Sequence, residues 1–417
     1  MHDATDRTAA TVNTAFTVSF DYPVHFVRGA FAPGNAVLAE TFDRRGEGRR
    51  HRVAAVLDEG LLAARPDLAD AVAAYFHAHP DRLELAGPPL TYPGGPAAKT
   101  DYGNLQTLLW TLGNLHLDRQ SFVLAVGGGS MLDAVGFGAS LVHRGLRLVR
   151  MPSTVLAQCD AGIGVKNGLD EHGQKNFLGT FAPPFAVLND AALLRTLDDA
   201  HWRGGVAEAF KVALIRDAAL FAWLEEHAAA LRERDAAVME QAIHACARIH
   251  LNHIAGGGDP FEMGSARPLD FGHWAAHRLE ILSGHTIGHG QAVAVGIALD
   301  CAYAVRKGLL EQDALERTVA ALERAGLPVY VDTLRLRRAD GELEVLRGLA
   351  DFREHLGGRL TVTLPDGIGR GIEVHHMNRD WIVDGIDWLR QDQAAVVHKR
   401  LFGCEEVRRT VPVGTVP

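Results

Sequence analysis

The sequence predicts an α/β protein in two domains, a parallel sheet covered by helices followed by a mainly α-helical domain. The chain has 417 residues, which is longer than a domain with a single hydrophobic core usually is. Short β-branched runs alternate with helical patterns in the first half, whereas apolar residues recur at helical spacing through most of the second. These two patterns predict domains at 1–192 and 193–417.

The expected strands of the first domain are short apolar runs that end in an acid, a serine or a glycine. They are the runs at 51–58, 121–128, 146–153 and 185–190. Helical patterns lie between them, for example at 68–79 and 104–117. Strands that alternate with helices form parallel sheets with helices on both faces.

The second domain is predicted to be helical because apolar residues recur every three to four positions. This spacing persists over 202–234 and 236–254. One late run, 359–368, is typical of a strand and predicts a small sheet at the domain edge. A sheet domain beside a helical domain leaves a cleft between them, which is where a site is expected.

The composition is that of a soluble globular protein, with 47% apolar and 22% charged residues. The net charge of −9 gives no electrostatic reason to expect nucleic acid or an anionic membrane as partner. Glycine and aspartate interrupt the long apolar runs, so no membrane-spanning segment is expected. The N-terminus is polar and is not expected to be a signal peptide. The four cysteines (Cys159, Cys246, Cys301, Cys404) show no paired spacing, so we expect buried reduced thiols and a cytoplasmic protein.

Three consecutive glycines, Gly127, Gly128 and Gly129, follow one expected strand and precede a helix. They let the backbone approach a ligand, and the helix offers free N–H groups to a pyrophosphate, as in Rossmann-like domains. Asp133 lies one turn into that helix. The order is not G-x-G-x-x-G, and a tight strand–helix turn is the alternative interpretation.

A polar segment at 159–181 carries Lys166 and Lys175 among glycines and asparagines. Such a segment is a poor core element and a good anion-binding loop. The alternative is an ordinary solvated loop, but the density of glycine, asparagine, aspartate and lysine favours a site.

Glu208 and Lys211 lie three residues apart on an expected helix. A surface ion pair is the ordinary explanation for this spacing. The helix is apolar around them, however, which favours a buried carboxylate that needs a partner such as a metal.

Four histidines, His273, His277, His285 and His289, fall within the stretch 269–293. One glutamate with two histidines is a usual catalytic zinc shell with an open position. Four histidines could supply two ligands and an acid–base group. His285 lies beside a glycine in an expected loop and is not assigned a function.

Taken together, these motifs resemble the sugar phosphate cyclases of the 3-dehydroquinate synthase superfamily over about residues 20–380. Within it the chain is most similar to EboD-type proteins and sedoheptulose 7-phosphate cyclases. The matching pieces, each weak alone but specific in order and spacing, are "PGGPAAKT", "GGGSMLD", "HRGLRLVRMPST", "DAGIGVKNG", "GQKNFLGTF", "GGVAEAFK", "LDFGHWAAH" and "GHGQAVAVG".

The resemblance implies a dehydroquinate synthase-like fold that binds NAD on the first domain and one divalent metal in the cleft. The metal is usually zinc, with cobalt as the alternative, and the implied ligands are Glu208, His273 and His289. The implied NAD positions, with the glycine turn, are Asp58, Lys99, Gly127, Gly128, Gly129, Asp133, Ser153, Thr154 and Asp160.

The resemblance also implies a substrate site and a homodimer. His277 matches a position near the leaving phosphate, and Arg144 matches an arginine that crosses a dimer interface to the neighbouring phosphate site. Substrate positions are implied for Lys166, Lys175, Asn176, Lys211, His250 and Asp270.

The implied reaction turns a seven-carbon sugar phosphate into a carbocycle with loss of phosphate, so the protein would be a carbon–oxygen lyase of cyclitol biosynthesis. Transient oxidation by NAD precedes elimination, re-reduction and an intramolecular aldol addition. Basic side chains would stabilise the departing phosphate.

Departures from the family pattern bear on the substrate. Pro96 stands where a glutamate often helps to hold NAD, and Gln291 replaces a usual glutamate. His250 stands near the position at which the family has a substrate-binding lysine. Asp270 is the residue type of the valiolone-type synthases, whereas His277 is the residue type of the quinate enzymes. The missing lysine favours sedoheptulose 7-phosphate, which has no carboxylate, over 3-deoxy-arabino-heptulosonate 7-phosphate.

Two other functions are compatible with these patterns. A metal- and NAD-dependent polyol dehydrogenase shares the fold and the "GGGS" turn, but a neutral polyol needs no lysine-rich segment. A catalytically dead binding protein is the second alternative, which the departures at Pro96 and Gln291 leave open.

Overall fold

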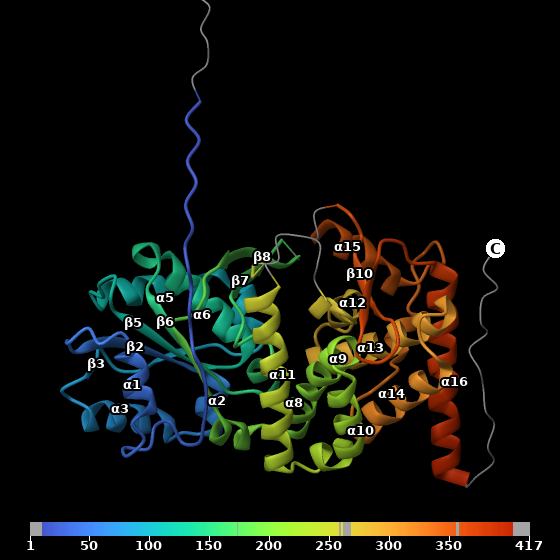
Figure 1. Ribbon diagram of the computed structural model, residues 1–417, viewed down its shortest axis with the longest axis horizontal. Helices are drawn as coiled ribbons and strands as arrows, with labels where there is room; N and C mark the ends of the chain where they lie inside the picture. The colour runs from blue at the N-terminus through green and yellow to red at the C-terminus, as the bar shows by residue number, and fades with distance from the viewer. Residues whose placement is uncertain (1–10, 173, 258–259, 262–267, 356–357, 403–417) are drawn as a thin grey trace, which may run out of the picture.

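The computed structural model describes residues 11–172, 174–257, 260–261, 268–355 and 358–402, and it forms two lobes side by side (Figure 1). The sheet lobe (11–196) is the blue-to-green part, and the helical lobe (199–402) is the yellow-green-to-red part. The predicted fold class is thereby confirmed. The boundary at 192/193 stays a prediction.

The sheet lobe is built on a parallel sheet whose described strands run in the order β1-β9-β6-β5-β2-β3, with β4 also paired to β2. The four runs expected as strands are β2, β5, β6 and β9. β3 and β4 pair with successive parts of β2 and form one interrupted edge. The strands are β1 (Val24–Val27), β2 (His51–Asp58), β3 (Leu83–Leu85), β4 (Leu90–Tyr92), β5 (Phe122–Gly127), β6 (Arg147–Pro152) and β9 (Ala186–Asp190).

Both faces of this sheet are covered, because successive side chains of a strand point to opposite faces. Val53 and Leu57 pack into one core with α1 and α3, whereas Ala54 and Val56 pack into another with α5 and α6. The helices of this lobe are α1 (Val37–Phe42), α2 (Glu59–Ala64), α3 (Leu68–Ala78), α4 (Ala97–Thr100), α5 (Tyr102–Asn114), α6 (Gly129–Leu141) and α7 (Val155–Cys159), with 3-10 turns η1 (Val142–Arg144) and η2 (Ala191–Thr196).

The segment 159–181, predicted to be a loop, is largely an antiparallel hairpin of β7 (Lys166–Glu171) and β8 (Gln174–Phe181). Its glycines permit close backbone contact instead of loosening the chain. A Cβ on Gly168 would lie 2.5 Å from the carbonyl oxygen of Leu178 on the facing strand. The loop prediction was therefore wrong in conformation.

The helical lobe packs around α13, which is buried along nearly its whole length. The helical pattern over 202–234 is confirmed but breaks near Gly205 and at Asp217, whose side chain caps α10. The helices are α8 (Asp199–Gly204), α9 (Val206–Arg216), α10 (Ala218–Arg232), α11 (Ala236–Gly256), α12 (His273–Leu282), α13 (His289–Lys307), α14 (Gln312–Arg324), α15 (Arg347–His355) and α16 (Arg379–Phe402), with 3-10 turns η3 (Pro268–Asp270), η4 (Asp332–Arg335) and η5 (Glu344–Leu346).

The strand expected within 359–368 is present as β10 (Val362–Pro365), paired with β11 (Gly371–Val374). None of the helices in the described part of the chain combines the length and the apolar character that a membrane-spanning segment requires.

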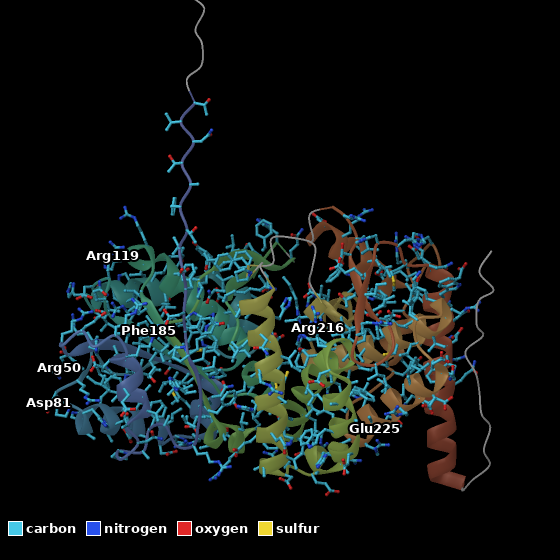
Figure 2. All side chains as sticks on the ribbon, viewed as in Figure 1. Arg50, Asp81, Arg119, Phe185, Arg216 and Glu225 are labelled. Carbon is cyan, nitrogen blue, oxygen red and sulfur yellow. The ribbon has the colours of Figure 1, made fainter. Side chains whose placement is uncertain are left out.

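Charged side chains such as Arg50 and Asp81 lie on the outer surface of the sheet lobe, whereas Phe185 is buried (Figure 2). The cysteines Cys159, Cys246 and Cys301 are buried and form no disulfide, as expected, and Cys404 lies outside the described residues.

Candidate active site

A cleft of about 1500 Å³ lies between the lobes and brings most of the predicted site residues together. Every one of them lines it except Gly127, Arg144 and Glu208. A smaller hollow of about 430 Å³, near Tyr303 and Trp381, contains no predicted site residue.

The sheet-lobe wall of the cleft is formed at a topological switch point. From β2 the chain pairs β3 and β4 on one side and then returns to place β5 on the other. Ligands of open α/β sheets bind outside the carboxyl ends of strands at such a point. Asp58 ends β2 there, and Gly128 begins the turn into α6.

The three glycines of that turn have different surroundings. A Cβ on Gly127 would lie 2.8 Å from Asp58 Cβ and 2.9 Å from Met131 Sδ, so this position requires glycine for packing. Gly128 and Gly129 line the cleft. A Cβ on Gly128 would meet nothing closer than 3.5 Å, which leaves its backbone open to a ligand.

Other predicted cofactor residues surround the same wall. Thr154 follows β6 and caps α7 by accepting a hydrogen bond from the Ala157 amide at 3.1 Å. Lys99 Nζ lies 3.0 Å from Asp133 Oδ2 and also donates to the side chain of Asn176. Lys99 therefore connects a predicted cofactor residue on α6 to a predicted substrate residue on β8.

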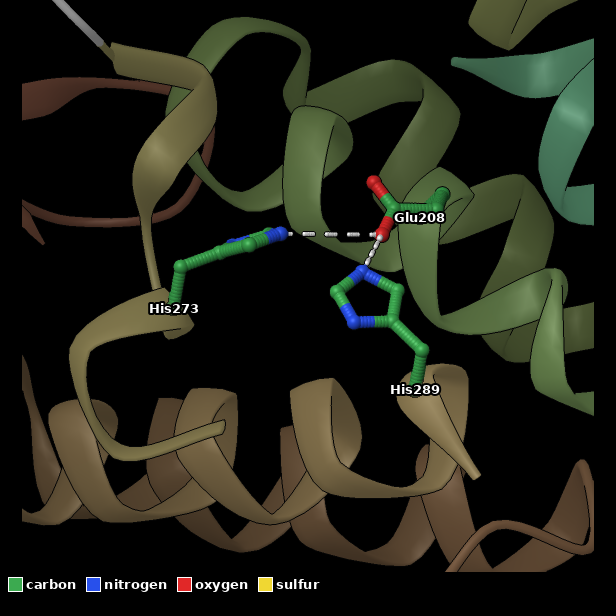
Figure 3. Close-up of side chains that lie close together, drawn as sticks. All are labelled: Glu208, His273 and His289. Carbon is green, nitrogen blue, oxygen red and sulfur yellow. Dashed lines mark ion pairs between the residues drawn. The ribbon is translucent and has the colours of Figure 1, made fainter. Parts of the chain in front are cut away.

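The helical-lobe wall brings Glu208, His273 and His289 together from α9, α12 and α13 (Figure 3). Glu208 Oε1 lies 3.9 Å from His273 Nε2 and 3.8 Å from His289 Nε2. Two ligands, each ~2.1 Å from a shared zinc ion in a tetrahedral shell, lie roughly 3.4 Å apart. Each histidine nitrogen would therefore have to move about half an ångström closer to Glu208 Oε1 to reach the spacing of zinc ligands.

Three observations favour a cation between these side chains. Glu208 is fully buried, and its Oε1 accepts no hydrogen bond from any described residue. Burial raises the pKa of Glu208, as expected for a carboxylate that lacks enough positive partners. Burial also holds the pKa of His273 well below its usual range, so this ring is neutral and can act as a ligand.

The orientation of both imidazoles is set by a second partner. His273 Nδ1 lies 3.0 Å from the carbonyl oxygen of Phe271, which can only accept, so Nδ1 carries the proton and Nε2 presents its lone pair. His289 Nδ1 lies 3.3 Å from Glu280 Oε2. Metal-binding histidines usually have such outer partners, and the donor set therefore fits zinc.

Lys211 lies beside this centre. Its Nζ is 2.5 Å from Glu208 Oε2 and 3.5 Å from Asp160 Oδ2. Burial alone lowers the pKa of Lys211, but Asp160 and Glu208 outweigh it and raise this pKa above its usual range. The lysine is a permanent buried cation next to the predicted metal position.

His250 and Asp160 form a pair at the junction of the lobes, with His250 Nδ1 2.8 Å from Asp160 Oδ1. Burial alone raises the pKa of Asp160, but Lys211 and His250 hold it well below its usual range. His250 thus supports an anionic aspartate instead of offering a free cation to substrate.

Glu280 is a site residue that the sequence analysis missed. It is 6% exposed, and its Oε2 lies 2.6 Å from Lys175 Nζ in addition to its contact with His289. Burial alone raises the pKa of Glu280, but His289 and Lys175 hold it below its usual range. The spacing of His273, His277 and Glu280 at i, i+4 and i+7 puts all three on one helical face and could have revealed it.

The remaining predicted catalytic residues have varied positions. Lys166 and the half-buried Asp270 line the cleft. Burial lowers the pKa of His277, whose ring lies 5.4 Å from that of His273. Arg144 is exposed outside this cleft with a φ of 66°, so its own chain does not bring it to the site.

Three residues singled out for departure or exclusion lie at the edge of the cleft. His285 is an exposed rim residue with a φ of 63°. Gln291 accepts a hydrogen bond from the Gly288 amide at 3.1 Å and so caps the start of α13. Pro96 is the residue immediately before α4, on the sheet-lobe wall.

Comparison with known proteins agrees with this geometry. A family model for the N-terminal domain of 3-dehydroquinate synthase matches residues 90–204, and one for the C-terminal domain matches 205–344. The chain is 33% identical over 360 residues to a 2-epi-valiolone synthase of Actinosynnema mirum, covering 86% of this chain and 89% of the relative. The chain belongs to the 3-dehydroquinate synthase superfamily of sugar phosphate cyclases.

Two further relatives of this cyclase differ in the product that their names give. It is 33% identical to a 3-dehydroquinate synthase of Rhodopseudomonas palustris, over 73% of this chain and 80% of the relative. The structure of a 2-epi-5-epi-valiolone synthase from Streptomyces hygroscopicus, described with NAD⁺ and Zn²⁺ bound, has a TM-score of 0.79 at 29% identity. That match covers 92% of the cyclase and all of the solved chain.

Proposed function

We propose that this cyclase converts sedoheptulose 7-phosphate into a 2-epi-5-epi-valiolone-type carbocycle with loss of phosphate. The observation that carries the proposal is that the buried Glu208 meets two cleft-lining histidines, His273 and His289, in a cleft whose other wall includes the glycine turn. Family membership favours this reaction over a polyol dehydrogenase.

The proposed cofactors are NAD and zinc, with cobalt as a replacement. Glu208, His273 and His289 would hold the metal, and Gly128 and Asp58 would lie against the dinucleotide. When bound, NAD accepts and returns a hydride while the metal polarises a hydroxyl oxygen. The valiolone synthase described with both supports this assignment.

The protein's own groups would then position the sugar and stabilise charge. Lys211 is a buried cation suited to hold a substrate oxygen, and Asp160 is held as an anion that accepts from a hydroxyl. Their pairing fixes both side chains before substrate arrives, which reduces the reorganisation needed for reaction.

The departing phosphate would be held by a basic group around the hairpin. Lys166, Lys175 and Asn176 come from β7 and β8, and neutral His277 can donate or accept a proton nearby. Arg144 from a second subunit would complete this group in a homodimer. Its exposed side chain, outside its own cleft, is compatible with that role.

The choice of sugar rests on charge. His250 stands where a lysine could pair with a substrate carboxylate, and it is already paired with Asp160. Sedoheptulose 7-phosphate has no carboxylate, whereas 3-deoxy-arabino-heptulosonate 7-phosphate does. The valiolone-type Asp270 and the two valiolone synthase relatives support the same sugar.

The test is incubation of the protein with NAD⁺, Zn²⁺ or Co²⁺, and each of these sugar phosphates in turn. Phosphate release, NADH absorbance and product mass are measured together. We expect phosphate release from sedoheptulose 7-phosphate without accumulating NADH. Steady NADH production indicates a dehydrogenase, and no phosphate from either sugar contradicts cyclase activity. Preference for the deoxy sugar reverses the substrate assignment.

No nucleic acid or membrane is needed for this reaction, and we expect the enzyme to act in the cytoplasm. The partners required are the small sugar phosphate and a second copy of the chain.

A further inference from the structure

One carboxylate oxygen connects the two lobes at the site. Glu280 lies on α12 in the helical lobe, and Lys175 lies on β8 in the sheet lobe. Glu280 Oε2 is 2.6 Å from Lys175 Nζ and 3.3 Å from Nδ1 of His289 on α13. A predicted metal ligand and a predicted substrate lysine thus share a single buried atom.

The surroundings of Glu280 show what occupies this position. His277, Glu280 and His289 form a second set of possible ligand atoms within 4.8 Å of one another. The ammonium group of Lys175 already contacts the carboxylate of this set, so a cation is present there without a second metal. Glu280 is 6% exposed and needs these partners to offset the cost of its burial.

We infer that Glu280 is a positioning residue that fixes the metal ligand His289 and the substrate lysine Lys175 relative to each other. The identities of metal and substrate rest on the proposed function. The physical argument requires only that His289 bind a cation through Nε2 and that Lys175 bind an anion.

The carboxylate acts on His289 through its ring. A proton on Nδ1 donated to Glu280 leaves Nε2 as the ligand atom, holds the plane of the ring and increases the basicity of Nε2. Replacing such an outer partner typically weakens metal binding or activity by about 10–100-fold. The same carboxylate limits the positions open to Lys175, whose stem is otherwise flexible.

The decisive variant is Glu280→Gln, which keeps the shape and removes the charge. The matched control is Glu344→Gln, which removes the acidic partner of Arg278 on the same helix, a 2.7 Å ion pair outside the cleft. Zinc affinity is measured by competition with a chromogenic chelator, without substrate. We expect ~10–100-fold weaker zinc binding for Glu280→Gln and wild-type affinity for Glu344→Gln.

The lysine is tested in the same proteins. Glu280→Gln should also raise KM for the sugar phosphate, whereas Lys175→Met should raise KM and leave the zinc site with all three of its ligands. Glu280→Asp keeps the charge with a shorter reach, so zinc binding should be intermediate between wild type and Glu280→Gln. A purely structural role would lower the melting temperature without this graded order.

Unchanged zinc affinity in folded Glu280→Gln overturns the inference, and so does unchanged affinity in Glu280→Asp if only that variant folds. The zinc measurement needs no turnover. Zinc affinities that fall in the predicted order from wild type through Glu280→Asp to Glu280→Gln would therefore support the role of Glu280 even if the wild-type protein released no phosphate. That absence of phosphate would contradict the proposed function alone.

Discussion

Replacing Arg150 by methionine should both destabilise the sheet lobe and weaken substrate binding. Arg150 lies on the central strand β6 and is fully buried. Its Nη1 donates to the carbonyl oxygens of Ala161 at 3.3 Å and Gly164 at 3.0 Å, and it lies 3.4 Å from that of Gly162. Its Nη2 donates to the Lys166 carbonyl oxygen at 3.0 Å and to Asn167 Oδ1 at 2.5 Å. One guanidinium therefore holds the chain that leads into the β7–β8 hairpin.

The magnitude follows from these contacts. Methionine has a similar length but leaves the buried carbonyl groups without donors. Hydrogen bonds to a charged group contribute ~1.5–3 kcal/mol each. The cost of burying the charge, which is also removed, offsets part of this sum, so we expect a net loss of about 3–5 kcal/mol from the buried oxygens left without donors. For a chain of this length, that corresponds to a fall in melting temperature of at least ~3 °C.

The assay is thermal unfolding together with KM for the sugar phosphate. Arg52→Met is the control, because Arg52 also lies in the sheet and donates to the carbonyl oxygens of Leu115 and His116, but its side chain is 37% exposed. We expect the control to cost under ~1 kcal/mol. Equal melting temperatures and equal KM for wild type and Arg150→Met would refute the reasoning.

Three further predictions concern the metal, the hairpin and pH. Glu208→Ala removes one of three predicted metal ligands, so zinc affinity should fall by more than the ~10–100-fold typical of losing an outer partner, together with turnover, whereas His285→Ala should change neither; metal content equal to wild type in the Glu208 variant contradicts the assignment. Lys166→Ala should raise KM for the sugar phosphate while NAD affinity, measured by calorimetry, stays the same; unchanged kinetics would remove this lysine from the site. Burial raises the pKa of Asp300 to about 7 from its ordinary value of 3.8, so the folded state retains a proton that the unfolded state has released, and stability falls as pH rises between these values. Asp300→Asn should remove this fall, and parallel curves of melting temperature against pH for the two proteins would disprove it.

The parallel sheet was predictable because its strands carry their own signal. The runs that became β5 and β9 are largely apolar on both faces, and those that became β2 and β6 are apolar apart from a few charged or polar residues; their short length separates all four from helices. The three predicted metal ligands followed only from the resemblance, since Glu208 is far in sequence from both histidines, and their metal binding stays a prediction. The comparisons support the family that carries this inference.

The hairpin and Glu280 were not predictable for different physical reasons. Gly168 sits in β7 because the facing backbone approaches closely, and composition cannot distinguish this use of glycine from a turn. Glu280 shares a helical face with two histidines, yet the charge that justifies its burial comes from Lys175, about a hundred residues earlier in the chain. Such a partner becomes visible only when the lobes are placed together.

The predicted metal ligands lie on α9, α12 and α13 of the helical lobe, whereas the glycine turn predicted to bind NAD lies on the sheet lobe, so the two proposed cofactors would be held by different lobes. A chelator could therefore remove the metal while NAD stays bound. Protein made when zinc is scarce could bind NAD first and zinc later. In the proposed site the sugar contacts both lobes. Changes in the few side chains where the lobes meet could therefore alter which sugar is accepted without changing the metal site or the NAD site.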